Sequence, residues 1–138
     1  MAFDQIQDDI EKLSPQGAGV IGMTAEEDVI AGQVVKLGAG SNSVEPSDTD
    51  GEEVFGVATQ TVSADDSVAV AGPGTIANVR ATDATSPGAI ASNGATGEEG
   101  EVVAAATGDE TIGILLDDIG AGEYGQAFIL PGAGGQVN

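Results

Sequence analysis

The 138-residue chain has 23 acidic residues against three basic ones, and its formal net charge is -20. It contains no cysteine and no histidine, which excludes thiolate nucleophiles, imidazole bases and metal sites built on either side chain. The acidic surface also lacks the basic patch that nucleic acids and anionic membranes require, so neither is an expected partner.

Apolar residues make up 41% of the chain and fall in regular blocks, which favours a folded domain with an acidic surface. Carboxylates in such numbers repel one another at low salt and are screened at molar salt, where the Debye length is about 3 Å. The composition therefore predicts a halophilic source. The N-terminus lacks the pattern of a signal peptide, and no run approaches the roughly 20 apolar residues of a membrane span, so we expect a soluble protein that is not exported.

Residues 3–13 have the apolar spacing of a short amphipathic helix. The apolar stripe consists of Phe3, Ile6, Ile10 and Leu13. Ser14-Pro15-Gln16-Gly17 ends the pattern. A helix of about 11 residues is marginal alone in water, so the stripe needs a surface to lie on. We predict that residues 1–17 form an arm whose stripe binds a partner; the alternative is that the stripe packs on its own domain.

From residue 18 onward the pattern favours short β-strands. Across the whole chain Val and Ile number 24, Leu and Met number 7, and 22 glycines interrupt the apolar runs. Strands are expected at residues 18–23, 28–37, 53–62, 67–71, 75–81, 88–91, 101–106, 111–117 and 126–130. Turn signals lie at Asp50-Gly51, Gly72-Pro73-Gly74, Asn93-Gly94 and Gly120-Ala121-Gly122. The prediction is one all-β domain over residues 18–138, a compact barrel, clip or sandwich.

One order of apolar and glycine residues occurs twice. The first copy runs Ala31-Gly32-Gln33-Val34-Val35, then Val54-Phe55-Gly56-Val57-Ala58, then an apolar strand closed by Gly72-Pro73-Gly74. The second runs Ser86-Pro87-Gly88-Ala89-Ile90, then Thr111-Ile112-Gly113-Ile114-Leu115, then an apolar strand closed by Pro131-Gly132. This pattern indicates a duplication, with one copy at about residues 28–74 and the other at about residues 86–132. The alternative is chance similarity in a chain rich in Gly, Ala and Val.

Two motifs resemble ligand sites without their context. Residues 17–22 match G-x-G-x-x-G, yet a dinucleotide site needs a strand before the motif and a helix after it. Here the predicted order is the reverse, so we interpret these glycines as a flexible joint. Residues 47–53 resemble the start of a calcium loop, but the later ligands are misplaced, which favours a solvated acidic hairpin.

Paired carboxylates occur at Asp8-Asp9, Glu26-Glu27, Glu52-Glu53, Asp65-Asp66, Glu98-Glu99 and Asp117-Asp118. Acid-base catalysis needs two carboxyl groups in a cleft with one pKa raised by burial, and none of these pairs sits on an apolar scaffold. We therefore predict no catalytic residue, no cofactor, no metal site and no enzymatic activity.

Three stretches resemble the capsid decoration and stabilisation proteins of tailed viruses, including the lambda-type head decoration protein. They are TAEEDVIAGQVVKL, EVFGVATQTVSADDSVAVAGPGTIANV and ETIGILLDDIGAGEYGQAFIL, and the resemblance covers roughly residues 24 to 130. It implies a β-clip or β-tulip fold, trimers on local threefold axes of the capsid, and an N-terminal arm that reaches the major capsid protein. The stripe matches the place of that arm, although a helical arm departs from the extended arm of the lambda-type member.

Resemblance and composition together predict a decoration or cement protein that stabilises the capsid of a haloarchaeal tailed virus. It would be made in the host cytoplasm and lie on the outside of the virion. The expected partners are the major capsid protein and other copies of this chain in a homotrimer. Two alternatives stay open: a turret, fibre base or tail element, and a ligand-binding β-clip module, because the opening D-V-I-A-G-Q-V-V also resembles small modules that bind sugars or acidic ligands.

Overall fold

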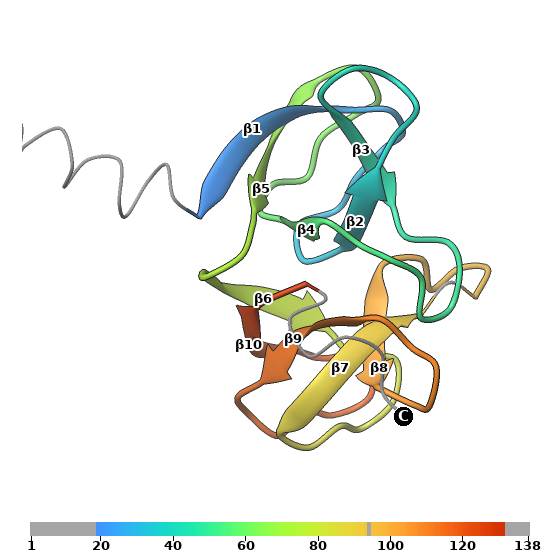
Figure 1. Cartoon of the computed structure of the whole chain (residues 1–138), viewed down its shortest axis with the longest axis vertical. Helices are drawn as coiled ribbons and strands as arrows, with labels where there is room; N and C mark the ends of the chain where they lie inside the picture. Colours follow the sequence, from blue (N-terminus) through green and yellow to red (C-terminus); the bar gives the residue numbers. More distant parts are fainter. Residues whose placement is uncertain (1–18, 94, 132–138) are drawn as a thin grey trace, which may run out of the picture.

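The computed structural model describes residues 19–93 and 95–131, which form ten strands and contain no helix (Figure 1). The all-β prediction is confirmed, whereas the predicted N-terminal helix lies outside the described residues. The strands are β1 (Val20–Ala25), β2 (Val34–Leu37), β3 (Ser43–Pro46), β4 (Gly56–Ala58), β5 (Ser67–Ala71), β6 (Ile76–Arg80), β7 (Gly88–Asn93), β8 (Glu101–Ala104), β9 (Thr111–Leu115) and β10 (Tyr124–Ile129). No helix in this part of the chain has the length and apolarity to cross a bilayer.

The first five strands close into a barrel in the order β1-β3-β2-β4-β5. Strand β5 returns to pair with β1 in antiparallel register from Val20 opposite Ala71 to Thr24 opposite Ser67. Strands β1 and β3 pair in parallel. The interior is filled by small and β-branched side chains: Met23, Ala25, Val29, Val35, Val44, Ala58, Val68 and Val70.

The last five strands form a sheet in the order β6-β10-β9-β7-β8, below the barrel in Figure 1. Its two edge strands approach each other again, because Ala81, directly after β6, forms a parallel bridge with Val102 of β8. The second unit is therefore a barrel that stays largely open between β6 and β8.

The two units share one pattern of strand pairing. The pairs β1/β5, β4/β5, β2/β4 and β2/β3 correspond to β6/β10, β9/β10, β7/β9 and β7/β8. The parallel β1/β3 pair corresponds to the bridge between Ala81 and Val102. The units begin and end at residues 20–71 and 76–129, so each starts about eight to ten residues before the repeat that the sequence shows. A duplicated unit would give this match, and both the duplication and the single-domain organisation stay predictions.

Strands β2 and β4 supply side chains to two cores. Val35 and Ala58 fill the barrel, whereas their neighbours Val34 and Val57 belong to the core of the second unit. Successive strand residues point to opposite faces, so these strands are buried on both sides. The second core consists of Val34, Val54, Val57, Val79, Ala81, Ile90, Val102, Ile112, Leu115, Ile119, Ala127 and Ile129. The barrel and the second unit therefore pack through a shared hydrophobic cluster.

The structure divides two predicted strands and adds one. Residues 28–37 break at Gly32, whose φ of +94° reverses the chain between an isolated bridge at Val29 and β2. Residues 53–62 likewise contain only β4 and a bridge at Val62. Strand β3 was not predicted, because a Ser-Val-Glu-Pro sequence is short and contains residues that strands disfavour.

The close approach of neighbouring strands explains why the middle segment of each repeat copy has a glycine at its centre. Gly56 lies in β4 and Gly113 in β9. A Cβ atom on Gly56 would collide with the main-chain carbonyl oxygen of Ala71, and one on Gly113 with that of Phe128. These oxygens belong to the adjacent strands β5 and β10, so they cannot move without disturbing the sheets.

We expect Gly56→Ala and Gly113→Ala each to lower the free energy of unfolding by about 1 to 3 kcal/mol, because an added methyl group overpacks the site. Gly22→Ala in β1 is the matched control, since a Cβ there meets no atom within 4 Å, and its effect should stay within about 0.5 kcal/mol. Urea unfolding measures all three. Equal costs at Gly22 and at the two motif glycines would contradict the close-approach explanation.

Candidate binding groove

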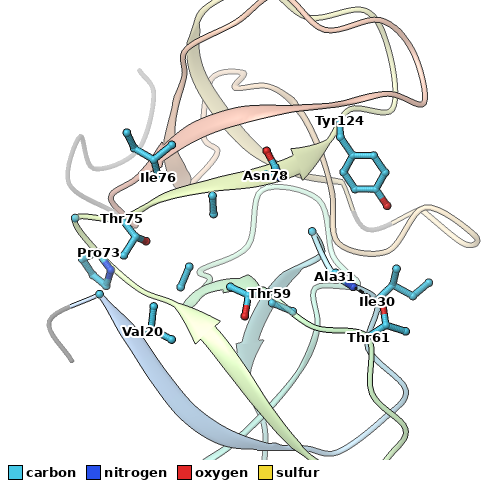
Figure 2. A pocket seen from close by; sticks show the side chains of 16 residues that line it. Val20, Ile30, Ala31, Thr59, Thr61, Pro73, Thr75, Ile76, Asn78 and Tyr124 are labelled. Atoms are coloured by element: carbon cyan, nitrogen blue, oxygen red, sulfur yellow. Dashed lines mark hydrogen bonds between the residues drawn. The ribbon is translucent and has the colours of Figure 1, made fainter. Parts of the chain in front are cut away.

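A groove of about 850 Å³ lies between the barrel and the second unit (Figure 2). Of the described residues, sixteen line it: Gly19, Val20, Ile30, Ala31, Gly32, Ala58, Thr59, Thr61, Ala71, Pro73, Gly74, Thr75, Ile76, Ala77, Asn78 and Tyr124. None of these sixteen side chains carries a charge, although the chain as a whole has a net charge of -20. The groove is therefore an uncharged surface on an otherwise acidic protein.

The rim of the groove carries large exposed apolar side chains. Val20 and Ile76 are 37% and 59% exposed and lie at one end with Pro73 (Figure 2). Ile30 and Tyr124 are 53% and 51% exposed and lie at the other end. Eight large hydrophobic side chains are exposed in the described part of the chain, and these four are half of them. Such a concentration of exposed apolar surface marks a binding site more often than chance exposure does.

The turn between Val29 and β2 builds the Tyr124 end of the groove. The amide of Ile30 donates to Oε1 of Gln33 at 2.8 Å, and the amide of Gly32 donates to the carbonyl oxygen of Ala58 at 2.8 Å. The Tyr124 ring packs so closely over Gly32 that a Cβ atom there would meet it at 2.7 Å. Glycine is therefore required at position 32 both by its positive φ and by the ring above it.

The threonine hydroxyl groups of the groove form hydrogen bonds with its own main chain. Thr59 Oγ1 donates to the carbonyl oxygen of Ala69 at 2.8 Å, and Thr75 Oγ1 donates to that of Gly72 at 2.7 Å. Thr61 Oγ1 accepts from the amide of Ala31 at 3.0 Å. These bonds give each threonine hydroxyl a partner within the protein. The chemistry of the groove suits an apolar segment better than a charged one.

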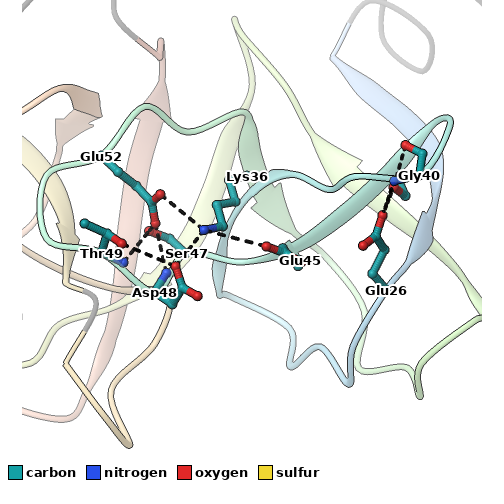
Figure 3. Close-up of polar contacts among 9 residues, drawn as sticks. Glu26, Lys36, Gly40, Glu45, Ser47, Asp48, Thr49 and Glu52 are labelled. Carbon is teal, nitrogen blue, oxygen red and sulfur yellow. Dashed lines mark hydrogen bonds and ion pairs between the residues drawn. The ribbon is translucent and has the colours of Figure 1, made fainter.

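The acidic loop at residues 47–53 closes on a lysine (Figure 3). Lys36 Nζ donates to Asp48 Oδ1 at 2.6 Å and to Glu52 Oε1 at 3.3 Å, and lies 3.6 Å from Glu45 Oε1. The other carboxylate oxygen of Glu52 accepts from Ser47 Oγ and from the amides of residues 48 and 49. An ammonium group thus lies among the carboxylates that gave this loop its likeness to a calcium site.

The same loop is not merely a solvated hairpin, as the sequence suggested. The amide of Gly51 donates to the carbonyl oxygen of Ser92 at 3.0 Å, and the amide of Glu110 donates to that of Gly51 at 2.9 Å. Both partners belong to the second unit, so the loop joins the two units. Gly51 has a φ of +61°, as the predicted turn at Asp50-Gly51 requires.

Two carboxylates are held ionised by local donors. The hydrogen bond from Lys36 lowers the pKa of Asp48 and in return raises the pKa of the lysine. The Ser43 hydroxyl, followed by the amide of Gly40 at 2.5 Å, lowers the pKa of Glu26. Because both carboxyl pKa values lie below those of the unfolded chain, this stabilisation is complete above about pH 5 and is lost as the pH falls through the folded values.

The sequence-predicted residues are spread over the surface or fall outside the described chain. The pairs from Glu26-Glu27 to Asp117-Asp118 lie in or beside separate turns, and Asp8-Asp9 and the stripe are not described. Within residues 19–93 and 95–131, no group of three or more acidic side chains is arranged to hold a metal ion. Strand β1 begins at Val20, inside the glycine motif of residues 17–22, and Gly22 pairs with Ala69 of β5. Residues 20–22 of the motif are therefore strand and not the flexible joint that the sequence predicted. The partner-binding role of the stripe stays a prediction.

Sequence reasoning missed the groove because its lining comes from separate segments of the chain. A signal was nevertheless present. Residues 29–44 and 67–82 are both free of acidic residues in a chain where acids are frequent, and each supplies part of the lining. Absence of charge over a whole supersecondary segment, more than any motif, could have located this surface.

The chain matches no protein-family model and no curated protein sequence. Its fold is similar to a solved structure, the N base of head fiber gp8.5 of bacteriophage phi29, with a TM-score of 0.62. The two are 18% identical, and the match covers 80% of this chain and 92% of that one. At this identity the likeness shows a common fold.

Lys36→Gln should lower the free energy of unfolding by about 1 to 2 kcal/mol, because it leaves three neighbouring carboxylates without their cation. This cost lies between the values typical of exposed and of buried ion pairs. The cost should be larger at about 0.1 M than at about 3 M NaCl, where the repulsion is screened. Urea unfolding at the two salt concentrations measures this. Arg80→Gln, which removes a single pair with Glu101, is the control, and a Lys36→Gln cost that does not change with salt would contradict the electrostatic explanation.

Proposed function

We propose that this chain is a structural protein of a tailed-virus virion that binds the outside of the capsid as a decoration or cement protein. The observation that carries the proposal is the fold that it has in common with the phi29 head fiber N base, over 92% of that chain. The sequence resemblance to capsid decoration proteins points independently to the same part of a virion. The acidic surface supports a virus of a halophilic host, since a net charge of -20 is tolerated best where salt screens it.

Four of the described ionisable residues support the fold through contacts with turns and loops. Lys36 joins β2 to the loop that contacts the second unit. Arg80 donates from Nε to the carbonyl oxygen of Gly122 and pairs with Glu101 at 3.0 Å. Glu26 and Glu52 accept hydrogen bonds from the main chain of turns. This use of charge suits a protein whose role is to hold a shape and present surfaces.

A head-fibre base is the second candidate, and the name of the phi29 neighbour is what favours it. A decoration protein and a fibre base both attach to the capsid exterior. They differ in whether the attached domain stabilises the shell or carries a projecting fibre. Particle stability with and without the protein separates the two, since a cement protein raises the temperature at which capsids break.

Self-association of the chain is supported by a comparison of the two units. The pairing register places Val20, Ala71, Val57 and Val34 in one row across the barrel, and Ile76, Phe128, Ile114 and Ala89 in the equivalent row of the second unit. In the barrel, Val34 and Val57 of this row are buried against the second unit. Their counterparts are uncovered, since Ala89 is exposed and Ile114 is 48% exposed.

Leu116, just beyond β9, adds to this uncovered surface and is 43% exposed. Because a unit of the same chain covers the equivalent row in the barrel, another copy of the chain fits the uncovered row. A homotrimer would bury this surface, and burial of this kind adds stability to a domain whose core is built from small residues.

The purified protein should be a trimer by light scattering in molar salt and should bind saturably to capsids that lack it. Ile114→Glu with Leu116→Glu should give monomers that bind capsids less tightly, because two charges replace the apolar contact. Leu37→Glu is the matched control, since Leu37 is 60% exposed in β2 and lies outside this surface. Co-sedimentation with particles measures the binding. Failure of the wild-type protein to bind any capsid would contradict the virion role, whereas a wild-type monomer that binds would contradict the trimer alone.

A further inference from the structure

We propose that the uncharged groove between the two units is the binding site for the apolar stripe Phe3, Ile6, Ile10 and Leu13 of the same chain. The proposal decides between the two alternatives that the sequence left open for this stripe. It does not depend on a place in a virion, because both the site and the segment belong to one chain.

The first step of the argument is chemical complementarity. The rim residues Val20, Ile30, Ile76 and Tyr124 leave a large apolar surface in water. A helix over residues 3–13 would carry its own uncovered stripe, and a helix of this length is marginal unless that face is buried. Binding of the stripe in the groove would cover both apolar surfaces and remove their area from water.

The second step is electrostatic. The predicted helix carries Asp4, Asp8, Asp9 and Glu11 off the stripe, with Lys12 as its one cation, and the chain as a whole has a net charge of -20. Against such a surface these carboxylates would meet like charges, which is unfavourable. The sixteen lining residues include no charged side chain, so the segment meets no carboxylate along the groove itself. Glu99 and Glu101 line the neighbouring hollow at the Tyr124 end, where Arg80 accompanies them. With the stripe facing the groove, its acidic residues stay in water and lose no hydration.

The third step is the point of attachment. Gly19 and Val20 themselves line the groove, so residue 18 joins the described chain at its edge. Leu13 precedes Gly19 by six positions, which an extended chain spans in at most about 20 Å. Pro15 and Gly17 lie between them and suit a reversal of the chain. The stripe can therefore reach the groove of its own chain.

The attachment also sets the direction of the segment. Val20, Pro73 and Ile76 mark the end of the groove next to Gly19, and Ile30 and Tyr124 mark the far end (Figure 2). A helix of 11 residues is about 16 Å long. Leu13 then lies near Ile76, and Phe3 lies near Ile30 and Tyr124. A short tether gives the segment an effective concentration in the millimolar range, which favours its own groove over that of another acidic copy.

The chain offers an unusually direct readout. It has one tyrosine and no tryptophan, so its intrinsic fluorescence reports on Tyr124 at the far end of the groove. We expect acrylamide to quench Tyr124 more strongly when Phe3, Ile6, Ile10 and Leu13 are all replaced by Ser than in the unaltered chain. Ile30→Glu with Ile76→Glu should raise quenching in the same way, because charges in the groove expel the stripe. Leu37→Glu, outside the groove, should leave quenching unchanged. Equal quenching in all variants would overturn the proposal.

Engineered disulfides identify which chain supplies the stripe. The chain contains no cysteine, so Phe3→Cys with Ile30→Cys adds a single reactive pair. We expect a disulfide within one chain, seen on a non-reducing gel as a monomer whose cysteines react with a maleimide only after reduction. Phe3→Cys with Leu37→Cys is the control pair and should stay reduced. A disulfide-linked dimer from the first pair would assign the groove to another copy and overturn the proposal. Protection of Tyr124 that develops only after capsids are added would overturn it in favour of an external partner.

Discussion

The burial of β2 and β4 on both faces is the constraint on which the rest of the structure depends. Val34 and Val35 are adjacent and both fully buried, one in the core of each unit. Val57 and Ala58 repeat this arrangement in β4. Since neighbouring residues on a strand face opposite ways, these strands can be buried only if a barrel lies on one side and a second unit on the other. The open side of the second unit provides that cover.

The groove and the loop contacts follow from this packing. Where the barrel and the second unit meet through Val34 and Val57, their surfaces touch; beyond Ala71 and Ala77 they diverge and leave the uncharged groove. The Lys36 cluster lies on the same strand β2, and its loop reaches Ser92 of the second unit. Most of the described acidic residues lie in turns, where salt can screen them, whereas Glu101 is buried in β8 and paired with Arg80. The protein thus combines an acidic exterior with one uncharged groove beside the contact between its units.

Much of the fold could be predicted from the sequence because local signals carried it. The strand at residues 67–71 was located to the residue, and Gly51, Gly74 and Gly122 have the positive φ that their predicted turns require. Strand β3 was missed because its pairing with β1 and β2, rather than its own propensity, makes it a strand. The apolar pair Val34-Val35 predicted burial but not two separate cores, since periodicity does not tell which element lies on each face. The groove depends on contacts between distant segments, and no local pattern records them.

Native-state hydrogen exchange tests most directly whether the shared core makes the two units one cooperative body. The amide of Ala58 donates to Gln33 in the barrel, and that of Ile129 donates to Thr75 in the second unit, both at 2.8 Å. Both amides should exchange with the free energy of global unfolding. Val34→Ala should lower both values equally, by about 1.5 to 3 kcal/mol, because it opens a cavity in the cluster that joins the units. A lower opening energy for one amide, or an effect of Val34→Ala on one unit alone, would show that the units unfold separately and would contradict the account.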